Sequence, residues 1–185
     1  MKSSYTNNNI SYGDIFAVTC RLKKPQTVIE FGILQGYSLK HISDNVDKSC
    51  KIVAYDIFGE FNGNSANKTV LLNTFNQYTN VSIQYGDFYK VFEQLANNSI
   101  DIIHIDIANN GEVFKFAIEK YFEKLTNDGV LILEGGSYER DNIDWMIKYN
   151  KPKIMDFIIE YKDKYDIVTI GTIPSVTFIQ RRRSE

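Results

Sequence analysis

The chain has 185 residues, of which 43% are hydrophobic and 24% are charged, and its formal net charge is −2 at pH 7. These values are ordinary for a soluble globular protein, and the length suits a single domain over residues 1–185 with a full core. The near-neutral charge excludes the broad basic surface that a nucleic acid would require. Residues 1–10 are too polar to pack on their own, and we expect them to be flexible.

The cysteines indicate the compartment. Cys20 and Cys50 are too few for a disulfide framework and too far apart in sequence for a metal motif. No signal peptide or membrane-spanning segment is recognisable, so we expect a cytoplasmic protein that does not contact a membrane.

Residues 27–38 are predicted to form a strand, a turn and the start of a helix. An apolar run leads to Glu30, and Gly32 and Gly36 follow before Ser38 begins an amphipathic helix. Because glycine has no Cβ, both glycines can adopt a positive φ or let a ligand lie against the main chain. Such turns bind many nucleotides but also form purely structural corners, so the turn alone is a weak signal.

Four further apolar runs are predicted to be strands, and each ends at an acidic residue. They are Lys51–Asp56, Val81–Asp87, Ile100–Asp106 and Gly129–Glu134. Helical patterns lie before and between the strands, at Tyr12–Leu22, 37–46, 66–78, 88–97 and 111–125. This alternation predicts a parallel α/β sheet, with the first helix capping one sheet edge or part of the active-site mouth.

The acids at the strand ends are the candidate ligand contacts. A single acid at such a position is more often a helix cap or a turn former. Several at corresponding positions favour a shared site, because ligands of such sheets bind at the carboxyl ends of the strands. Asp56 follows the first glycines by about 20 residues, where an acid accepts both hydroxyls of a ribose. Glu30 has a structural alternative, in which it binds backbone N–H groups and holds the glycine turn.

These motifs together resemble class I S-adenosylmethionine-dependent methyltransferases over roughly residues 25–135. The pattern is Glu-x-Gly-x-x-x-Gly-x-Ser from Glu30, followed by Asp56, Gly86-Asp87, Asp106 and the segment 125–134 that closes with Glu134. Segments 30–38 and 105–113 are most similar to the small O-methyltransferase-like group. The resemblance implies a Rossmann-like, doubly wound, mostly parallel seven-stranded sheet. Its C-terminal antiparallel hairpin would be Tyr165–Gly171 and Ser175–Arg181.

The resemblance also implies S-adenosylmethionine as cofactor. Gly32 and Gly36 would pack against its methionine part, Glu30 would orient the amino group, and Ser38 would donate to the carboxylate. Asp56 would hold the ribose hydroxyls.

For the adenine, the resemblance assigns Asp87 to the amino group, with Phe88 covering the ring and Ile57 or Phe58 on its other face. Asp106 is a further expected cofactor contact. A cationic sulfonium favours an acidic, partly apolar pocket, which is consistent with these roles.

The chain departs from the family where catalysis is concerned. Metal-dependent members carry an acid after the fourth strand and two ligands after the fifth; Asp106 and Glu134 match, but Gly135 replaces the last ligand. We therefore expect a weakened Mg²⁺ site, in which repulsion raises the pKa of one of the two acids. Asn109 stands where many relatives have a histidine base. Asp106 and His104, which share a strand face, are the catalytic candidates, and a buried structural His104 is the alternative.

Two loops are candidates for substrate recognition. Gly59–Asn67 follows the ribose-binding strand and is expected to close over the cofactor as a lid. Gly135–Trp145 leaves the fifth strand beside the expected methyl group, where Tyr138, Arg140 and Trp145 would line an acceptor pocket. The alternative is an exposed loop that leads to a helix burying Trp145.

The main hypothesis is methyl transfer from S-adenosylmethionine to a small-molecule oxygen, with nitrogen less favoured. Such a transfer needs mostly alignment, so it survives the loss of a base. A catalytically inactive, methyltransferase-like nucleoside-binding protein is the alternative. A nicotinamide-dependent oxidoreductase is disfavoured because the turn is Gly-x-x-x-Gly rather than Gly-x-Gly-x-x-Gly. A homodimer is the expected assembly.

Overall fold

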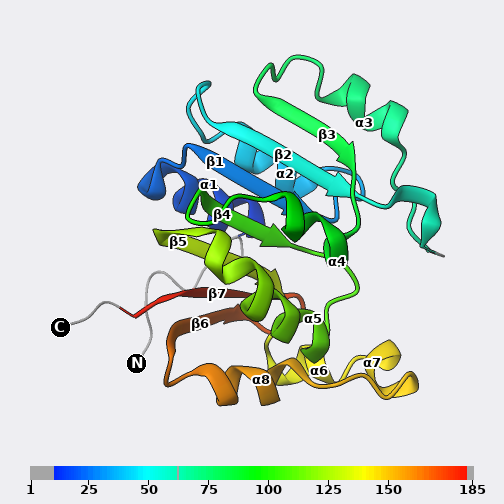
Figure 1. The fold of residues 1–185 in the computed structure, drawn as a ribbon. Helices are drawn as coiled ribbons and strands as arrows, with labels where there is room; N and C mark the ends of the chain where they lie inside the picture. Colours follow the sequence, from blue (N-terminus) through cyan, green and yellow to red (C-terminus); the bar gives the residue numbers. More distant parts are fainter. Residues whose placement is uncertain (1–10, 62, 183–185) are drawn as a thin grey trace, which may run out of the picture.

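One sheet of seven strands organises the chain, in the order β3-β2-β1-β4-β5-β7-β6 (Figure 1). This computed structural model describes residues 11–61 and 63–182, so the flexibility expected of residues 1–10 concerns a segment outside the described residues. The strands are β1 (Thr27–Phe31), β2 (Lys51–Asp56), β3 (Val81–Tyr85), β4 (Ile100–Ile105), β5 (Leu125–Glu134), β6 (Tyr165–Gly171) and β7 (Ser175–Arg181). β1 to β5 are parallel, and β7 pairs antiparallel with β5 and β6. The predicted fold class and the closing hairpin are confirmed.

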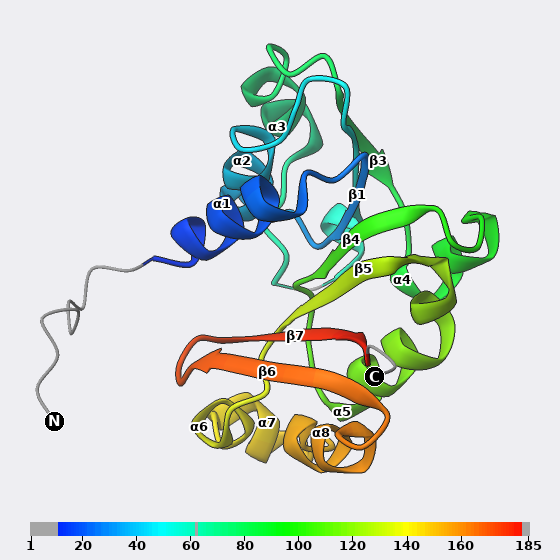
Figure 2. The same cartoon turned by 90° about the vertical axis from the view of Figure 1, so that its left-hand side faces the viewer.

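Helices cover both faces of the sheet (Figure 2). They are α1 (Tyr12–Lys23), α2 (Tyr37–Ser43), α3 (Lys68–Thr74), α4 (Phe88–Val91), α5 (Gly111–Phe116), α6 (Tyr138–Asp141), α7 (Asp144–Lys148) and α8 (Ile154–Tyr161). α1, α2 and α3 pack on one face, and α4, α5 and α8 pack on the other. Within residues 11–61 and 63–182, no helix has the length and apolar character that a membrane span needs.

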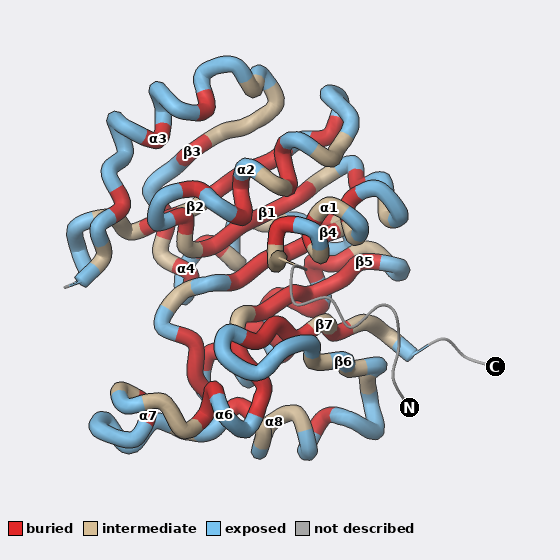
Figure 3. Tube along the Cα trace, turned by 180° about the vertical axis from the view of Figure 1, so that it is seen from behind, coloured by how far each residue is buried: buried red, intermediate tan, exposed pale blue. Residues whose placement is uncertain are grey.

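Side chains of the central strands alternate between two hydrophobic clusters. Val28 and Ile102 join the cluster under α1 and α2, whereas Ile29 and Ile103 join the cluster under α4, α5 and α8. Because both faces are covered, the strands are nearly continuous apolar runs, and the buried stretches of Figure 3 follow them. The same alternation places every second residue of β1 and β4 on the α1 and α2 face, up to the ends of the strands.

Several predicted helices are shorter or less regular than expected. The pattern over 88–97 becomes α4 and a 3₁₀ turn at Phe92–Gln94, and α5 continues as a π-helical turn over Ala117–Tyr121. Another 3₁₀ turn, Phe122–Lys124, leads directly into β5, which begins at Leu125 rather than at Gly129. The starts of the helices agree better with prediction, and side chains cap several of them: Ser11 and Asp14 form a capping box at α1, and Asn67, Asp87 and Asn110 cap α3, α4 and α5.

Candidate functional site

Acidic side chains from several strands gather at the carboxyl ends of the parallel strands. The strand register places Glu30 beside Ala54 of β2 and His104 of β4, on the face that α1 and α2 cover. Glu30, His104 and Glu134 all lie close enough to Asp106 to change its pKa. The structure thus brings together four of the predicted site residues from three strand ends.

Glu30 is fully buried and is held by two side chains rather than by backbone N–H groups. The Ser38 hydroxyl donates to its Oε1 atom, and Nδ1 of His104 lies 2.9 Å from the same oxygen. Oε2 is buried and has no hydrogen-bond partner. His104 is 2% exposed and packs edge-on against the Phe16 ring of α1, at 4.7 Å between centroids. The buried alternative therefore holds for His104, which supports Glu30 and does not face an acceptor.

Asp56 ties three segments together through one carboxylate. Its Oδ2 accepts from the N–H groups of Ile33 and Leu34 in the glycine turn, at 2.8 and 3.5 Å. Its Oδ1 accepts from the N–H of Phe58 at 2.6 Å and from Nδ2 of Asn64 at 2.7 Å. Asn64 belongs to the predicted lid, and nothing in the sequence signals that it reaches back to Asp56. A ribose at this carboxylate would share it with Asn64 or displace it.

Gly32 and Gly36 both adopt positive φ angles, +86° and +83°. A Cβ at Gly32 would lie 1.9 Å from the backbone oxygen of Asp106, and one at Gly36 would lie 2.6 Å from the Phe75 ring. The space that a side chain would need at either glycine is therefore already filled by other protein atoms. Both glycines are required by the turn and by the close packing of neighbouring segments, and only their main chain is left to face a ligand.

The predicted adenine contacts are only partly available. Asp87 caps α4 by accepting from the N–H of Tyr89 at 2.9 Å, and its side chain is half-buried. Ile57 is also half-buried. Phe88 is 4% exposed and stacks on Tyr121 in the core, with centroids 5.0 Å apart. The expectation that Phe88 covers a ligand ring is wrong for this arrangement, because the core under α4 takes its ring.

Glu134 forms a bidentate ion pair with Arg140, a residue that the sequence had placed in an acceptor pocket. Nε of Arg140 lies 2.6 Å from Oε1 and Nη2 lies 2.7 Å from Oε2. Asn109, which replaces the expected histidine base, is fully buried and donates to the backbone oxygens of Ile105 and Glu134. It joins the ends of β4 and β5 and takes no part in proton transfer.

Asp106 is solvent-accessible but has a perturbed pKa. Desolvation by the surrounding protein raises the pKa of Asp106 to about 6; Glu134 and Glu30 also raise it, and His104 and Arg140 lower it. The pKa of one acid is raised, as expected, but desolvation by the crowded protein around Asp106 contributes more than repulsion from the neighbouring carboxylates. Burial and the Glu134 carboxylate likewise raise the pKa of Tyr12, so the start of α1 lies near the same cluster of acidic residues.

The residues at this site do not fit the divalent cation that the sequence predicted. Both oxygens of Glu134 are engaged by Arg140. A Cβ on Gly135 would lie 2.6 Å from Cδ1 of Ile154, so a side chain there would point into the core. Across the described ranges, no three His, Cys, Asp or Glu residues are grouped to hold a metal ion. The prediction of a Mg²⁺ site at Asp106 and Glu134 is corrected accordingly, because the guanidinium of Arg140 binds Glu134, one of the two proposed ligands.

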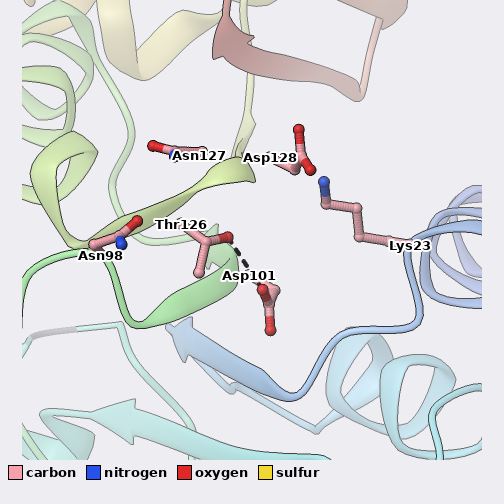
Figure 4. A pocket seen from close by; sticks show the side chains of 6 residues that line it. All are labelled: Lys23, Asn98, Asp101, Thr126, Asn127 and Asp128. Carbon is pink, nitrogen blue, oxygen red and sulfur yellow. Dashed lines mark hydrogen bonds between the residues drawn. The ribbon is translucent and has the colours of Figure 1, made fainter.

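A shallow polar depression lies at the opposite end of the strands (Figure 4). It is lined by Lys23, Asn98, Asp101, Thr126, Asn127 and Asp128. Asp101 accepts from the N–H groups of Gln26 and Thr27 and from the Thr126 hydroxyl, which is the dashed contact in the figure. These hydrogen bonds give the Asp101 carboxylate a structural role. The depression is separate from the acidic residues at the carboxyl ends of the strands.

Comparison with known proteins agrees with this architecture. Residues 29–134, more than half of the chain, match the family model described as "Methyltransferase domain". No curated protein sequence matches the chain significantly. Among solved structures, the SAH-bound methyltransferase PaMTH1 of Podospora anserina has a TM-score of 0.70 at 16% identity, covering 93% of this chain and 78% of that one.

Two O-methyltransferases have the same fold. TomG from Streptomyces achromogenes, in complex with SAM, has a TM-score of 0.67 at 15% identity over 96% of this chain and 83% of that one. The enzyme from Bacillus cereus, in complex with SAH, has a TM-score of 0.66 at 14% identity over 94% and 83%. The chain therefore belongs to the methyltransferase-domain family, as its resemblance to class I S-adenosylmethionine-dependent methyltransferases predicted.

Proposed function

We propose that the protein transfers a methyl group from S-adenosylmethionine to an oxygen of a small molecule. The observation that carries the proposal is the set of carboxylates at the ends of β1, β2 and β4, in which Oε2 of Glu30 is buried without a partner. Partnerless buried oxygens are rare in native proteins. An amino group of a ligand, directly or through a water molecule, would satisfy this one.

The other cofactor contacts follow from the same edge of the sheet. Asp56 would hold the ribose hydroxyls once Asn64 gives way. Asp87 and Ile57 would lie beside the adenine, and the main chain of Gly32 and Gly36 beside the methionine part. When bound, S-adenosylmethionine supplies a methyl group on a positively charged sulfur, which is already activated for displacement.

Asp106 is the proposed proton acceptor. A carboxylate with a pKa of about 6 is mostly ionised at pH 7, and its pKa is close enough to that pH for efficient general-base catalysis. Unlike His104, Asp106 is accessible to solvent and hence to an acceptor. A hydroxyl placed beside it would lose its proton to the carboxylate as the oxygen attacks the methyl group.

Titration calorimetry with S-adenosylmethionine, S-adenosylhomocysteine and NAD tests the cofactor assignment. We expect micromolar binding of the two sulfur compounds and none of NAD; NAD binding alone would overturn the proposal. Methyl transfer to a panel of phenols, catechols and amines then tests the reaction. Binding without turnover of any acceptor would favour the alternative, a nucleoside-binding protein without activity.

A further inference from the structure

The Glu134–Arg140 pair is built into the fold rather than formed by two free surface side chains. Only 7% of the Arg140 side chain and 19% of the Glu134 side chain are exposed. The N–H of Arg140 donates to the Ser137 hydroxyl at 3.0 Å, which starts α6. The next residue, Asp141, accepts from the first two N–H groups of α8, at 2.9 and 2.8 Å. The guanidinium is therefore positioned by backbone and helix contacts.

The pair also engages both carboxylate oxygens of Glu134. The two N–H groups of the guanidinium fork engage the two carboxylate oxygens, which is the strongest geometry for such a pair. The Trp145 ring lies over the guanidinium, with Cζ 5.3 Å from its centroid. The remaining nitrogen, Nη1, is buried and has no hydrogen-bond partner. Water and ions reach this side of the pair poorly.

We propose that Arg140 supplies the cation of the acidic cluster formed by Glu30, Asp106 and Glu134: its guanidinium binds Glu134 and prevents Asp106 and Glu134 from binding a divalent metal. Mg²⁺ requires about six oxygen ligands at short distances, and Glu134 cannot serve both it and the arginine fork. The guanidinium of Arg140, rather than a bound metal ion, then supplies the positive charge beside Asp106. The inference rests on the proposed function only for the identity of the acidic cluster as the active site, and its test needs no methyl transfer.

Mn²⁺ binding, followed by electron paramagnetic resonance and calorimetry, tests this inference in three proteins. Wild type should show no site up to about 10 mM Mn²⁺, whereas Arg140→Met should gain a site of about 1 mM because two carboxylates are released. Arg182→Met is the matched control, since Arg182 pairs with Asp166 on the exposed surface, at 3.6 Å. It should behave as wild type. Adding Glu134→Gln to Arg140→Met should abolish the new site.

If Arg140→Met does not fold, Arg140→Gln replaces it, because glutamine keeps a donor for Glu134 without the charge. Folding is checked by circular dichroism and thermal melting. A wild-type site with a dissociation constant of about 10 mM or less that Glu134→Gln removes would overturn the proposal. A folded, neutral variant at position 140 that gains no Mn²⁺ site would overturn it as well. Failure of methyl transfer, by contrast, concerns only the proposed function.

Discussion

Replacement of Asp56 by alanine should damage both the fold and the cofactor site. The carboxylate is 5% exposed and accepts from the N–H groups of Ile33 and Phe58, at 2.8 and 2.6 Å, and from Asn64. Hydrogen bonds to a charged group contribute about 1.5–3 kcal/mol each. Because the donors can partly rehydrate, we expect the free energy of unfolding to fall by about 3–5 kcal/mol. The melting temperature should fall by about 10 °C.

Asp101→Ala is the matched control for the structural part of this effect. Asp101 also accepts from two backbone N–H groups and one side chain: Gln26 at 2.7 Å, Thr27 at 3.0 Å and the Thr126 hydroxyl at 3.1 Å. It lies at the opposite end of the strands and is only half-buried, so its loss should cost about 1–3 kcal/mol. Its loss should leave cofactor binding unchanged.

The two variants are compared by urea unfolding and by calorimetry with S-adenosylmethionine, at a temperature where both are folded. Asp56→Ala should bind the cofactor at least tenfold more weakly, a loss of about 1.4 kcal/mol or more, and Asp101→Ala should bind as wild type. Equal affinities in the two folded variants would refute the assignment of Asp56 to the ribose. Equal stability of Asp56→Ala and wild type would refute the account of its backbone bonds.

Substitutions at three further positions, Gly32, Asp106 and His104, test other parts of the site, with Gly63→Ala and Glu30→Gln as companion variants. Gly32→Ala should lower the free energy of unfolding by more than about 3 kcal/mol, because the new Cβ would meet a backbone oxygen at 1.9 Å. Gly63→Ala, at φ +100° with nothing within 4 Å, should cost only about 1 kcal/mol by the same urea assay. Asp106 has a folded pKa of about 6, above its ordinary 3.8, so its contribution to stability is fully present below pH 3.8 and is lost as pH rises through 6. Asp106→Asn should therefore be more stable than wild type at pH 7.5, by about 1 kcal/mol after allowance for its exposure, and no more stable at pH 4; a constant difference would refute this. His104→Leu should cost about 2–4 kcal/mol by leaving buried Glu30 one partner fewer, and Glu30→Gln should recover part of that loss in a double-mutant cycle.

Local pattern was sufficient to predict the parallel part of the sheet and the position of its acids, because strands buried on both faces are continuous apolar runs. The closing hairpin, Tyr165–Gly171 and Ser175–Arg181, was predicted with its observed bounds from the resemblance to the methyltransferase family. Because parallel strands share their carboxyl edge, acids at the strand ends, such as Glu30 and Asp106, had to lie on the same side of the molecule. These properties depend on residues close together in the chain, or on the direction that all parallel strands have in common.

The partners of those acids were decided only by tertiary structure. His104 contacts Glu30 because of the register between β1 and β4, and the choice between a buried and a catalytic histidine depended on the packing of α1. Arg140 meets Glu134 because Asp141 attaches α6 to the start of α8. No local pattern encodes the docking of two elements. Long, flexible arginine and asparagine side chains contact whichever carboxylate the packed elements bring within reach, so charge pairing at this site follows from the assembled fold.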